Sequence, residues 1–128
     1  MNVTIEGAKA WLVELSKYND SQLGEIRVGL GKGVDVTAYA DPKFDSTQMM
    51  MIRWGLERDV DVSLYADPKY NFEQMLQIRL GLERGVDVSV YADPKYNFDQ
   101  MQEIREELQN KKKAKNKEAI NKLMKKER

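Results

Sequence analysis

Apolar side chains recur along this chain with a period of 26 residues. Within each unit one stretch carries apolar positions at i, i+3 and i+7, as Met49, Ile52 and Leu56 do in the second unit. That spacing places the three side chains on one stripe of an amphipathic helix. The pattern therefore predicts one long helix per unit.

Each predicted long helix opens with the same start signal. An Asn or Asp stands three residues before a Gln, which is the spacing of a capping box. The residue before the Asn or Asp is aromatic, and it forms the spacing of a hydrophobic staple with an apolar residue five positions later. The predicted caps are Asn19, Asp45, Asn71 and Asn97. We therefore expect helices to begin near residues 20, 46, 72 and 98.

The same register predicts where the first three long helices end. A glycine in the left-handed conformation commonly follows the end of a helix, and Gly33 and Gly85 stand in that place. Asp59 takes it in the second unit, and an aspartate tolerates this conformation. The expected ends are near Lys32, Arg58 and Arg84.

A further glycine lies inside each of these helices, where it costs about 1 kcal/mol relative to alanine. Its repetition indicates a packing reason, and we expect a neighbouring backbone to lie close to it. These glycines are Gly29, Gly55 and Gly81.

The connector between long helices contains Val-Asp-Val-Ser or Val-Asp-Val-Thr and then Tyr-Ala-Asp-Pro. In the third connector Asp87 has the position of an N-cap, and Val86 and Tyr91 have the spacing of a staple. This favours a short helix that ends at Pro94, because proline disfavours helical geometry in the residue before it. The alternative is a β-strand, since apolar and polar residues also alternate here, and a strand would make a βα solenoid that resembles leucine-rich repeats.

Two further segments flank the four units. Thr4 can cap a helix over residues 4–17 that would cover the open end of the first unit. The fourth long helix lacks the glycine stop and is expected to continue into a basic helical tail at residues 111–128. The predicted fold is all-α: a short α-solenoid of four units with a 26-residue period over residues 1–110, an N-terminal capping helix, and that tail.

The repeated unit resembles a known short repeat. The stretch from Phe44 to Pro68 contains Gln-Met, Ile-Arg-Trp-Gly-Leu-Glu, Val-Asp-Val-Ser and Tyr-Ala-Asp-Pro in that order. It is similar to a repeat of uncharacterised proteins from gut anaerobic Gram-positive bacteria and their mobile elements. The resemblance covers about residues 18–108. It implies a repeat-bearing protein of conjugative elements or prophages, and it implies no catalytic residues.

The composition excludes several kinds of chemistry. The chain has neither Cys nor His, which excludes thiol nucleophiles, disulfides, Cys/His zinc sites and histidine acid–base catalysis. We expect no enzymatic activity, no cofactor and no bound metal. No apolar run approaches the ~20 residues of a membrane span, and the N-terminus lacks the order of a signal peptide. A cytoplasmic location is therefore expected.

The formal net charge of zero conceals two oppositely charged parts. Residues 111–128 hold nine basic and two acidic residues, whereas residues 1–110 hold 12 basic and 19 acidic ones. A tail without aromatic residues would bind nucleic acid only non-specifically, and a solvated helix end explains its lysines as well. Its apolar stripe is too thin for a membrane role. The candidate contacts for a polyanion are Lys111, Lys112, Lys113, Lys115 and Lys117.

The positions that vary between units identify a candidate interaction face. On the two central long helices these positions are largely apolar, and Met and Trp make adaptable or strong contacts at interfaces. The candidate partner-binding residues are Met50, Met51, Trp54, Leu76, Gln77 and Leu80. Two alternatives are open: the same side chains could pack inside the core between units, or they could form a homodimer interface.

Two columns of Asp and one column of Arg recur with the same period. Helix capping and turns before proline explain the aspartates, and the Gly and distal Glu of a calcium-binding loop are missing. The arginines stand next to the Ile column, and we expect structural ion pairs, for example of Arg53 with Asp41 or Asp67.

Together these features predict a non-enzymatic protein–protein interaction module with a protein partner, an accessory or host-interaction factor of a mobile element or prophage. The alternative is an inhibitor of a host nucleic-acid enzyme, of the anti-CRISPR kind, that acts through the acidic body.

Overall fold

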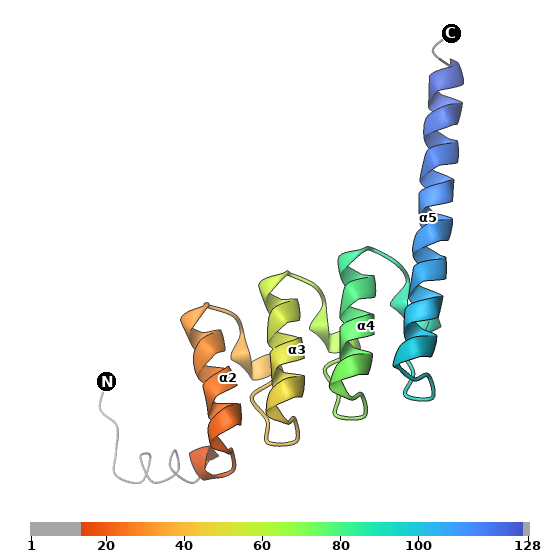
Figure 1. The fold of residues 1–128 in the computed structure, drawn as a ribbon. Coiled ribbons are helices and arrows are strands. Elements are labelled where there is room, and N and C mark those ends of the chain that lie inside the picture. Colours follow the sequence, from red (N-terminus) through yellow and green to blue (C-terminus); the bar gives the residue numbers. More distant parts are fainter. Residues whose placement is uncertain (1–13, 127–128) are drawn as a thin grey trace.

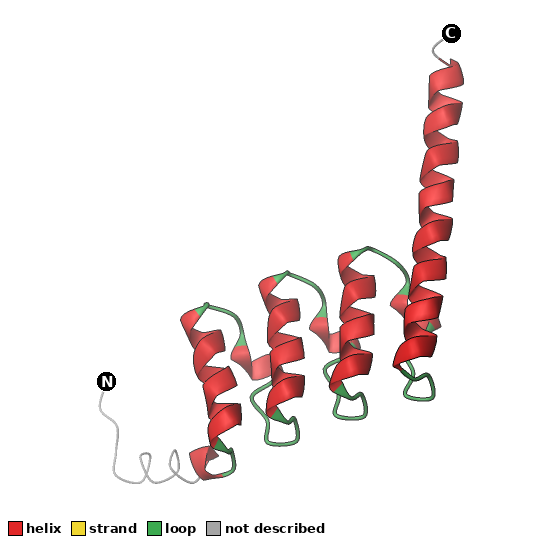
Figure 2. Ribbon diagram, in the orientation of Figure 1, coloured by secondary structure: helices red, strands yellow, loops and turns green. Residues whose placement is uncertain are grey.

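A computed structural model describes residues 14–126, and every regular element in this range is helical (Figures 1 and 2). The all-α prediction is therefore confirmed for the described range. The long helices are α2 (Asp20–Gly31), α3 (Ser46–Glu57), α4 (Phe72–Glu83) and α5 (Phe98–Lys126). Between them lie turns of 3-10 helix, η1 (Val36–Ala38), η2 (Val62–Leu64) and η3 (Val88–Val90).

The capping helix predicted over residues 4–17 lies mostly outside the described residues; within its range residues 14–16 are helical. Among residues 14–126 there is no helix with the length and apolar character needed to cross a membrane.

The predicted helix starts are confirmed. At the start of α3 the Gln48 amide N–H donates to Asp45 Oδ1 at 2.8 Å, and the Asp45 amide N–H donates to Gln48 Oε1 at 2.9 Å. The same reciprocal capping box opens α2, α4 and α5 at Asn19, Asn71 and Asn97. Each box joins atoms three residues apart, so the start of each helix is a local property.

The predicted helix ends are confirmed as well. Lys32, Arg58 and Arg84 are the C-caps of α2, α3 and α4. The next residue has a positive φ in each case, 74° at Gly33, 55° at Asp59 and 68° at Gly85. In α5 this stop is missing, and the helix continues without interruption to Lys126.

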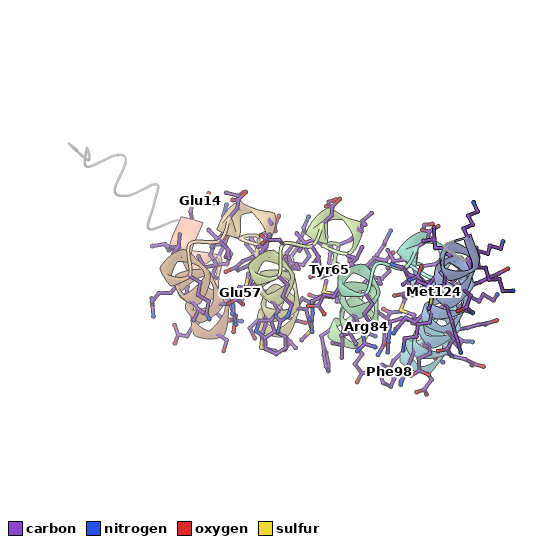
Figure 3. All side chains as sticks on the ribbon, turned by 90° about the horizontal axis from the view of Figure 1, so that it is seen from above. Glu14, Glu57, Tyr65, Arg84, Phe98 and Met124 are labelled. Carbon is purple, nitrogen blue, oxygen red and sulfur yellow. The ribbon has the colours of Figure 1, made fainter. Side chains whose placement is uncertain are left out.

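The long helices lie side by side in one row and run in the same direction (Figure 1). Each packs against the next one in the sequence, α2 on α3, α3 on α4 and α4 on α5. The connectors return the chain along one side of the row, so that the view from above shows a layer of long helices and a layer of connectors (Figure 3). The second half of α5 projects beyond the row.

The core lies between these two layers. Each connector contributes a tyrosine with no exposed surface, and the long helices meet it with methionine and isoleucine side chains. The fully buried residues include Tyr39, Tyr65, Tyr91, Met49, Ile52, Met75, Ile78 and Met101.

The interior glycines of α2, α3 and α4 make room for the tyrosine of the following connector. The Tyr65 hydroxyl donates to the Met51 carbonyl oxygen at 2.8 Å. A Cβ on Gly55 would lie 2.0 Å from that hydroxyl oxygen and 2.7 Å from Cγ1 of Val62. Gly29 and Gly81 have the same surroundings. The expectation of a close backbone was wrong, because side chains of the next connector occupy this space.

The connector folds as a short helix rather than a strand, but it ends earlier than predicted. The 3-10 turn of the third connector starts after Asp87, whose side chain accepts from the Ser89 amide as an N-cap at 3.1 Å. The turn stops at Tyr91, whose φ of −129° is no longer helical, so proline at position 94 is not what ends it. Tyr91 is fully buried at this point, and its hydroxyl donates to the Gln77 carbonyl oxygen of α4.

In α2, α3 and α4 a glutamine bonds to the end of the connector that follows. Gln48 Nε2 donates to the carbonyl oxygen of Tyr70 at 2.7 Å and to that of Pro68 at 3.4 Å. Gln22 and Gln74 make the equivalent bonds. The amide group that completes the capping box thus also satisfies buried carbonyl groups of the following turn.

Candidate interaction surface

The side of the long helices that faces away from the connectors carries the candidate partner-binding residues. Position 54 lies about 160° around the helix from the centre of the buried stripe formed by Met49, Ile52 and Leu56, at 100° per residue. Four of the six candidates are half-buried and keep an accessible surface. They are Met50, Trp54, Leu76 and Leu80, which we call the outer face.

The other two candidates, Met51 and Gln77, lie in the junctions between long helices. Their exposed fractions are 4% and 3%. The Gln77 side chain accepts a hydrogen bond from Arg105 Nε at 2.9 Å. These two residues pack between neighbouring units, which is the alternative in which variable residues belong to the core.

The arginine ladder is part of the same junctions. Arg53 is buried and donates from Nε to Glu25 Oε2 at 3.0 Å and from NH1 to Glu57 Oε2 at 2.8 Å. The expected pairing with Asp41 or Asp67 was wrong. Glu25 comes from the preceding long helix and Glu57 from the next turn of α3, because the guanidinium points between long helices and not toward the connectors.

Arg79 occupies the same position in the next junction but has fewer partners. Its NH1 donates to Glu83 at 3.0 Å, whereas its buried Nε has no hydrogen-bond partner among the described residues. The residue that corresponds to Glu25 is Met51 here, and a thioether offers only a weak acceptor. The guanidinium carbon lies 5.6 Å from the centroid of the Trp54 ring, within the range of a cation–π contact.

Charged side chains border the outer face at the C-terminal ends of the helices. Lys32 Nζ lies 2.9 Å from Glu57 and Arg58 Nε lies 2.8 Å from Glu83, so each pair bridges two units. The hydrogen bond from Lys32 lowers the pKa of Glu57 below its usual range. Lys32, Arg58 and Trp54 line a shallow open hollow between α2 and α3.

Sequence reasoning missed Lys32 and Arg58 as part of this surface. The signal was available, because basic residues recur at Lys32, Arg58 and Arg84 one helical turn after the variable column that contains Trp54. Residues at i and i+4 share one face of a helix. Figure 3 labels Glu57 and Arg84 in the layer of long helices.

The candidate polyanion contacts of the tail are all exposed. One of them has a structural role: Lys112 Nζ donates to the carbonyl oxygen of Gly85 at 2.8 Å, beyond the end of α4. A lysine at this end of a helix satisfies a free carbonyl group and complements the helix dipole. Lys111 lies 3.5 Å from Glu107 on its own helix. Lys113, Lys115 and Lys117 extend from the projecting part of α5.

The two aspartate columns have the local roles expected for them. The column of Asp35, Asp61 and Asp87 caps the 3-10 turns, and hydrogen bonds from Thr37 lower the pKa of Asp35. In the second column Asp67 accepts from the Lys69 amide at 2.9 Å, as expected for a turn. Among the described residues no three acidic side chains come together in a group that could hold a metal ion.

Comparisons with known proteins add no relative. No family model, no curated protein and no solved structure matches this chain.

Proposed function

We propose that the row of long helices and connectors is a short α-solenoid, closed at its N-terminal side by the helix predicted over residues 4–17. We propose further that it acts as a non-enzymatic protein–protein interaction module whose contact surface is the outer face. The observation that carries this proposal is the contrast between columns. Caps, glycines and glutamines repeat from unit to unit, whereas the positions on the outer face change.

The chemistry of the outer face supports a protein partner. Met50, Trp54, Leu76 and Leu80 lie on two adjacent helices and combine an adaptable thioether with a large aromatic ring. Lys32 and Arg58 stand at the border. An apolar centre with a charged rim is the usual anatomy of a protein interface, and Trp is enriched among the residues that dominate binding energy. A partner with apolar anchors and flanking carboxylates would complement it.

The resemblance of residues 18–108 to a repeat of gut anaerobic bacteria and their mobile elements supports an accessory or host-interaction factor of such an element. The rival function, inhibition of a host nucleic-acid enzyme, draws support from the exposed carboxylates of Asp35, Asp61 and Asp87, which recur once per unit. The rival predicts binding that weakens steeply with salt.

The test is a pull-down from a lysate of an anaerobic Gram-positive host with quantitative mass spectrometry. Wild-type protein is compared with Trp54→Ala and with Leu80→Glu, both on the outer face. Leu30→Glu is the matched control, because Leu30 is an exposed apolar residue of α2 outside the outer face. Circular dichroism verifies that each variant keeps its helices.

We expect at least one host protein to be retained by wild type and by Leu30→Glu and to be lost with both outer-face variants. The proposal fails if the retained proteins are the same for all four chains. Loss of binding on neutralising Asp61 and Asp87, with the outer-face variants still active, would favour the enzyme inhibitor instead.

A further inference from the structure

Two exposed surfaces of this chain complement each other, and their apolar parts do not meet within one molecule. The first is the projecting part of α5, where every residue from 110 to 126 is exposed. A helix of this length extends about 25 Å at 1.5 Å per residue. Isolated helices shorter than about 12–15 residues are marginal in water, and a longer one still gains from packing. The tail therefore offers a helix face that a partner would stabilise.

One stripe of the tail is basic in its first half and apolar in its second half. Lys113, Lys117, Ile120 and Met124 follow one another at i, i+4, i+7 and i+11 and so share one stripe. Leu123 lies beside Ile120 and Met124, and these three side chains are between 56% and 64% exposed. We call this set the tail stripe. Exposed apolar side chains gathered on one stripe mark a contact surface.

The second surface lies on the connector side of the row. Leu64 on η2 and Val90 on η3 are 48% and 50% exposed. Between these two turns is an open hollow whose apolar lining includes Leu64, Leu82, Val86 and Val88. Asp87 stands at its edge, and Asp61 occupies the same place on the preceding turn.

The net charges of the two surfaces indicate which segment could bind in this hollow. The connectors, residues 33–45, 59–71 and 85–97, contain eight Asp and three Lys, a net charge of −5. The tail, residues 111–128, carries a net charge of +7. Opposite charges of this size attract at close range and steer association. The apolar ends of both surfaces can then exclude water together.

At its start the tail contacts the third connector of its own molecule, where Lys112 Nζ donates to the carbonyl oxygen of Gly85. Beyond this point the tail continues α5 as one helix without a break and points away from the row, so its apolar end does not reach the hollow of its own molecule (Figure 1). We propose that the tail stripe docks in the hollow between η2 and η3 of a second copy of this chain, with Ile120, Leu123 and Met124 in the hollow. Lys113 and Lys117 then face the carboxylates of the connectors. Exchange of the two tails gives a closed dimer with two identical contacts.

The first experiment measures self-association of the full chain by sedimentation velocity over a range of concentrations and salt. We expect a monomer–dimer equilibrium that weakens as salt rises. Leu123→Glu should raise the dissociation constant by about tenfold or more, because a large apolar side chain is lost from the contact. Ala114→Glu adds the same charge to a different face of the same helix and should change the dissociation constant far less.

The decisive experiment is complementation between two defective chains. Val90→Glu blocks the connector side and Leu123→Glu blocks the tail, so each variant alone should be monomeric. A mixture should regain dimers, because the intact tail of the first variant meets the intact connectors of the second. A symmetric contact between two tails would not respond to Val90→Glu at all.

Three results would overturn the proposal. The first is a full chain that stays monomeric at all concentrations while its tail binds anionic vesicles or RNA. The second is a mixture of Val90→Glu and Leu123→Glu chains that does not regain dimers. The third is a dimer that is lost with Trp54→Ala and kept with Leu123→Glu, which would place the contact on the outer face.

Discussion

The junction between α3 and α4 and the junction between α4 and α5 each bury an arginine at the same position of the repeat. The hydrogen bonding of its Nε differs between them. Arg105 Nε donates to Gln77, whereas Arg79 Nε has no hydrogen-bond partner among the described residues because Met51 stands in the equivalent place. An unsatisfied buried donor costs roughly 1–3 kcal/mol. The two junctions thus differ by one polar contact, which an apolar side chain replaces between α3 and α4.

The junction in which Arg79 Nε has no partner among the described residues lies under the outer face. Trp54 stacks on the Arg79 guanidinium from the outer face, where Met50 lies on the same helix and Leu80 on the next one. Residues that break a local stability rule are often kept for binding. This coincidence supports the proposal that the outer face of α3 and α4 contacts a partner.

The largest expected effect concerns a feature that α3 and α4 share, the interior glycine beside a buried tyrosine. Gly55→Ala and Gly81→Ala would each drive a methyl group into a buried tyrosine hydroxyl and a valine side chain. We expect a loss of about 3 kcal/mol in the free energy of unfolding for each, because overpacking and a broken hydrogen bond outweigh the gain in helix propensity. Denaturant unfolding followed by circular dichroism measures it.

Gly24→Ala is the control for this pair, since a Cβ at Gly24 meets nothing within 4 Å. It should stabilise the protein by up to about 1 kcal/mol. If Gly55→Ala also stabilised the protein, the tyrosine contact would not be what requires the glycine.

The second prediction removes the acceptor of Arg105 Nε, so that the junction between α4 and α5 resembles the one between α3 and α4. Gln77→Met should leave Arg105 Nε without its acceptor, as Arg79 Nε is now, and should lower the free energy of unfolding by about 2 kcal/mol. Gln102→Met is the control, because Gln102 is half-buried and its side chain donates to Glu106 on the same helix rather than to an arginine. Equal midpoints for both variants would mean that the guanidinium finds another partner at little cost.

The third prediction concerns the pH dependence of stability, through the buried tyrosines Tyr65 and Tyr91 of the second and third connectors. Burial raises the pKa of Tyr91 to about 12 from the ordinary value of 10.0, and it raises the pKa of Tyr65 too. Below pH 10 the phenol is protonated in both states, so its contribution to stability is fully present. Between pH 10 and 12 the unfolded chain loses the proton first, and stability falls by about 1.4 kcal/mol per pH unit for each such tyrosine.

Tyr91→Phe should therefore make the loss of stability above pH 10 less steep, although it lowers stability at neutral pH by about 1 kcal/mol through the lost hydrogen bond. Urea midpoints at a series of alkaline pH values test this, with Tyr96→Phe as a control at a half-buried ring. An unchanged slope in Tyr91→Phe would show that this phenol ionises equally in both states.

The smallest expected effect is the reverse conversion. Met51→Gln should give Arg79 Nε the acceptor that Arg105 Nε has, and should raise the free energy of unfolding by about 1 kcal/mol. Met50→Gln, one residue away on the outer face, should stay within about 0.5 kcal/mol of wild type. A destabilised Met51→Gln would mean that apolar packing in this junction outweighs the missing hydrogen bond.

Contacts among the helices and connectors were harder to predict than the helices and connectors themselves. The arginine column was recognised, but its carboxylate partners were assigned to the connectors, whereas Glu25 and Glu57 belong to long helices. The interior glycines were recognised, but the group that fills the space beside them was not. The first depends on which face of one unit meets which face of the next, and the second depends on how a connector folds back on its own long helix. A repeat in the sequence specifies neither. The candidate residues were predicted as one face, but the packing of neighbouring helices separates them. Met51 and Gln77 are buried in junctions, and Trp54 lies outside.

The sequence by itself determined where each long helix begins and ends. A capping box at Asp45 and Gln48, or a left-handed residue at Gly85, works through atoms within a few residues of one another, so no neighbour is needed. Only the tertiary structure decided the bonds that join a long helix to its connector or to the preceding unit. Tyr65 reaches a carbonyl 14 residues earlier in its own unit, and Arg53 reaches a carboxylate of the preceding unit 28 residues earlier. Such distances close only when helices and connectors pack against one another, because that packing sets which side chains come within reach.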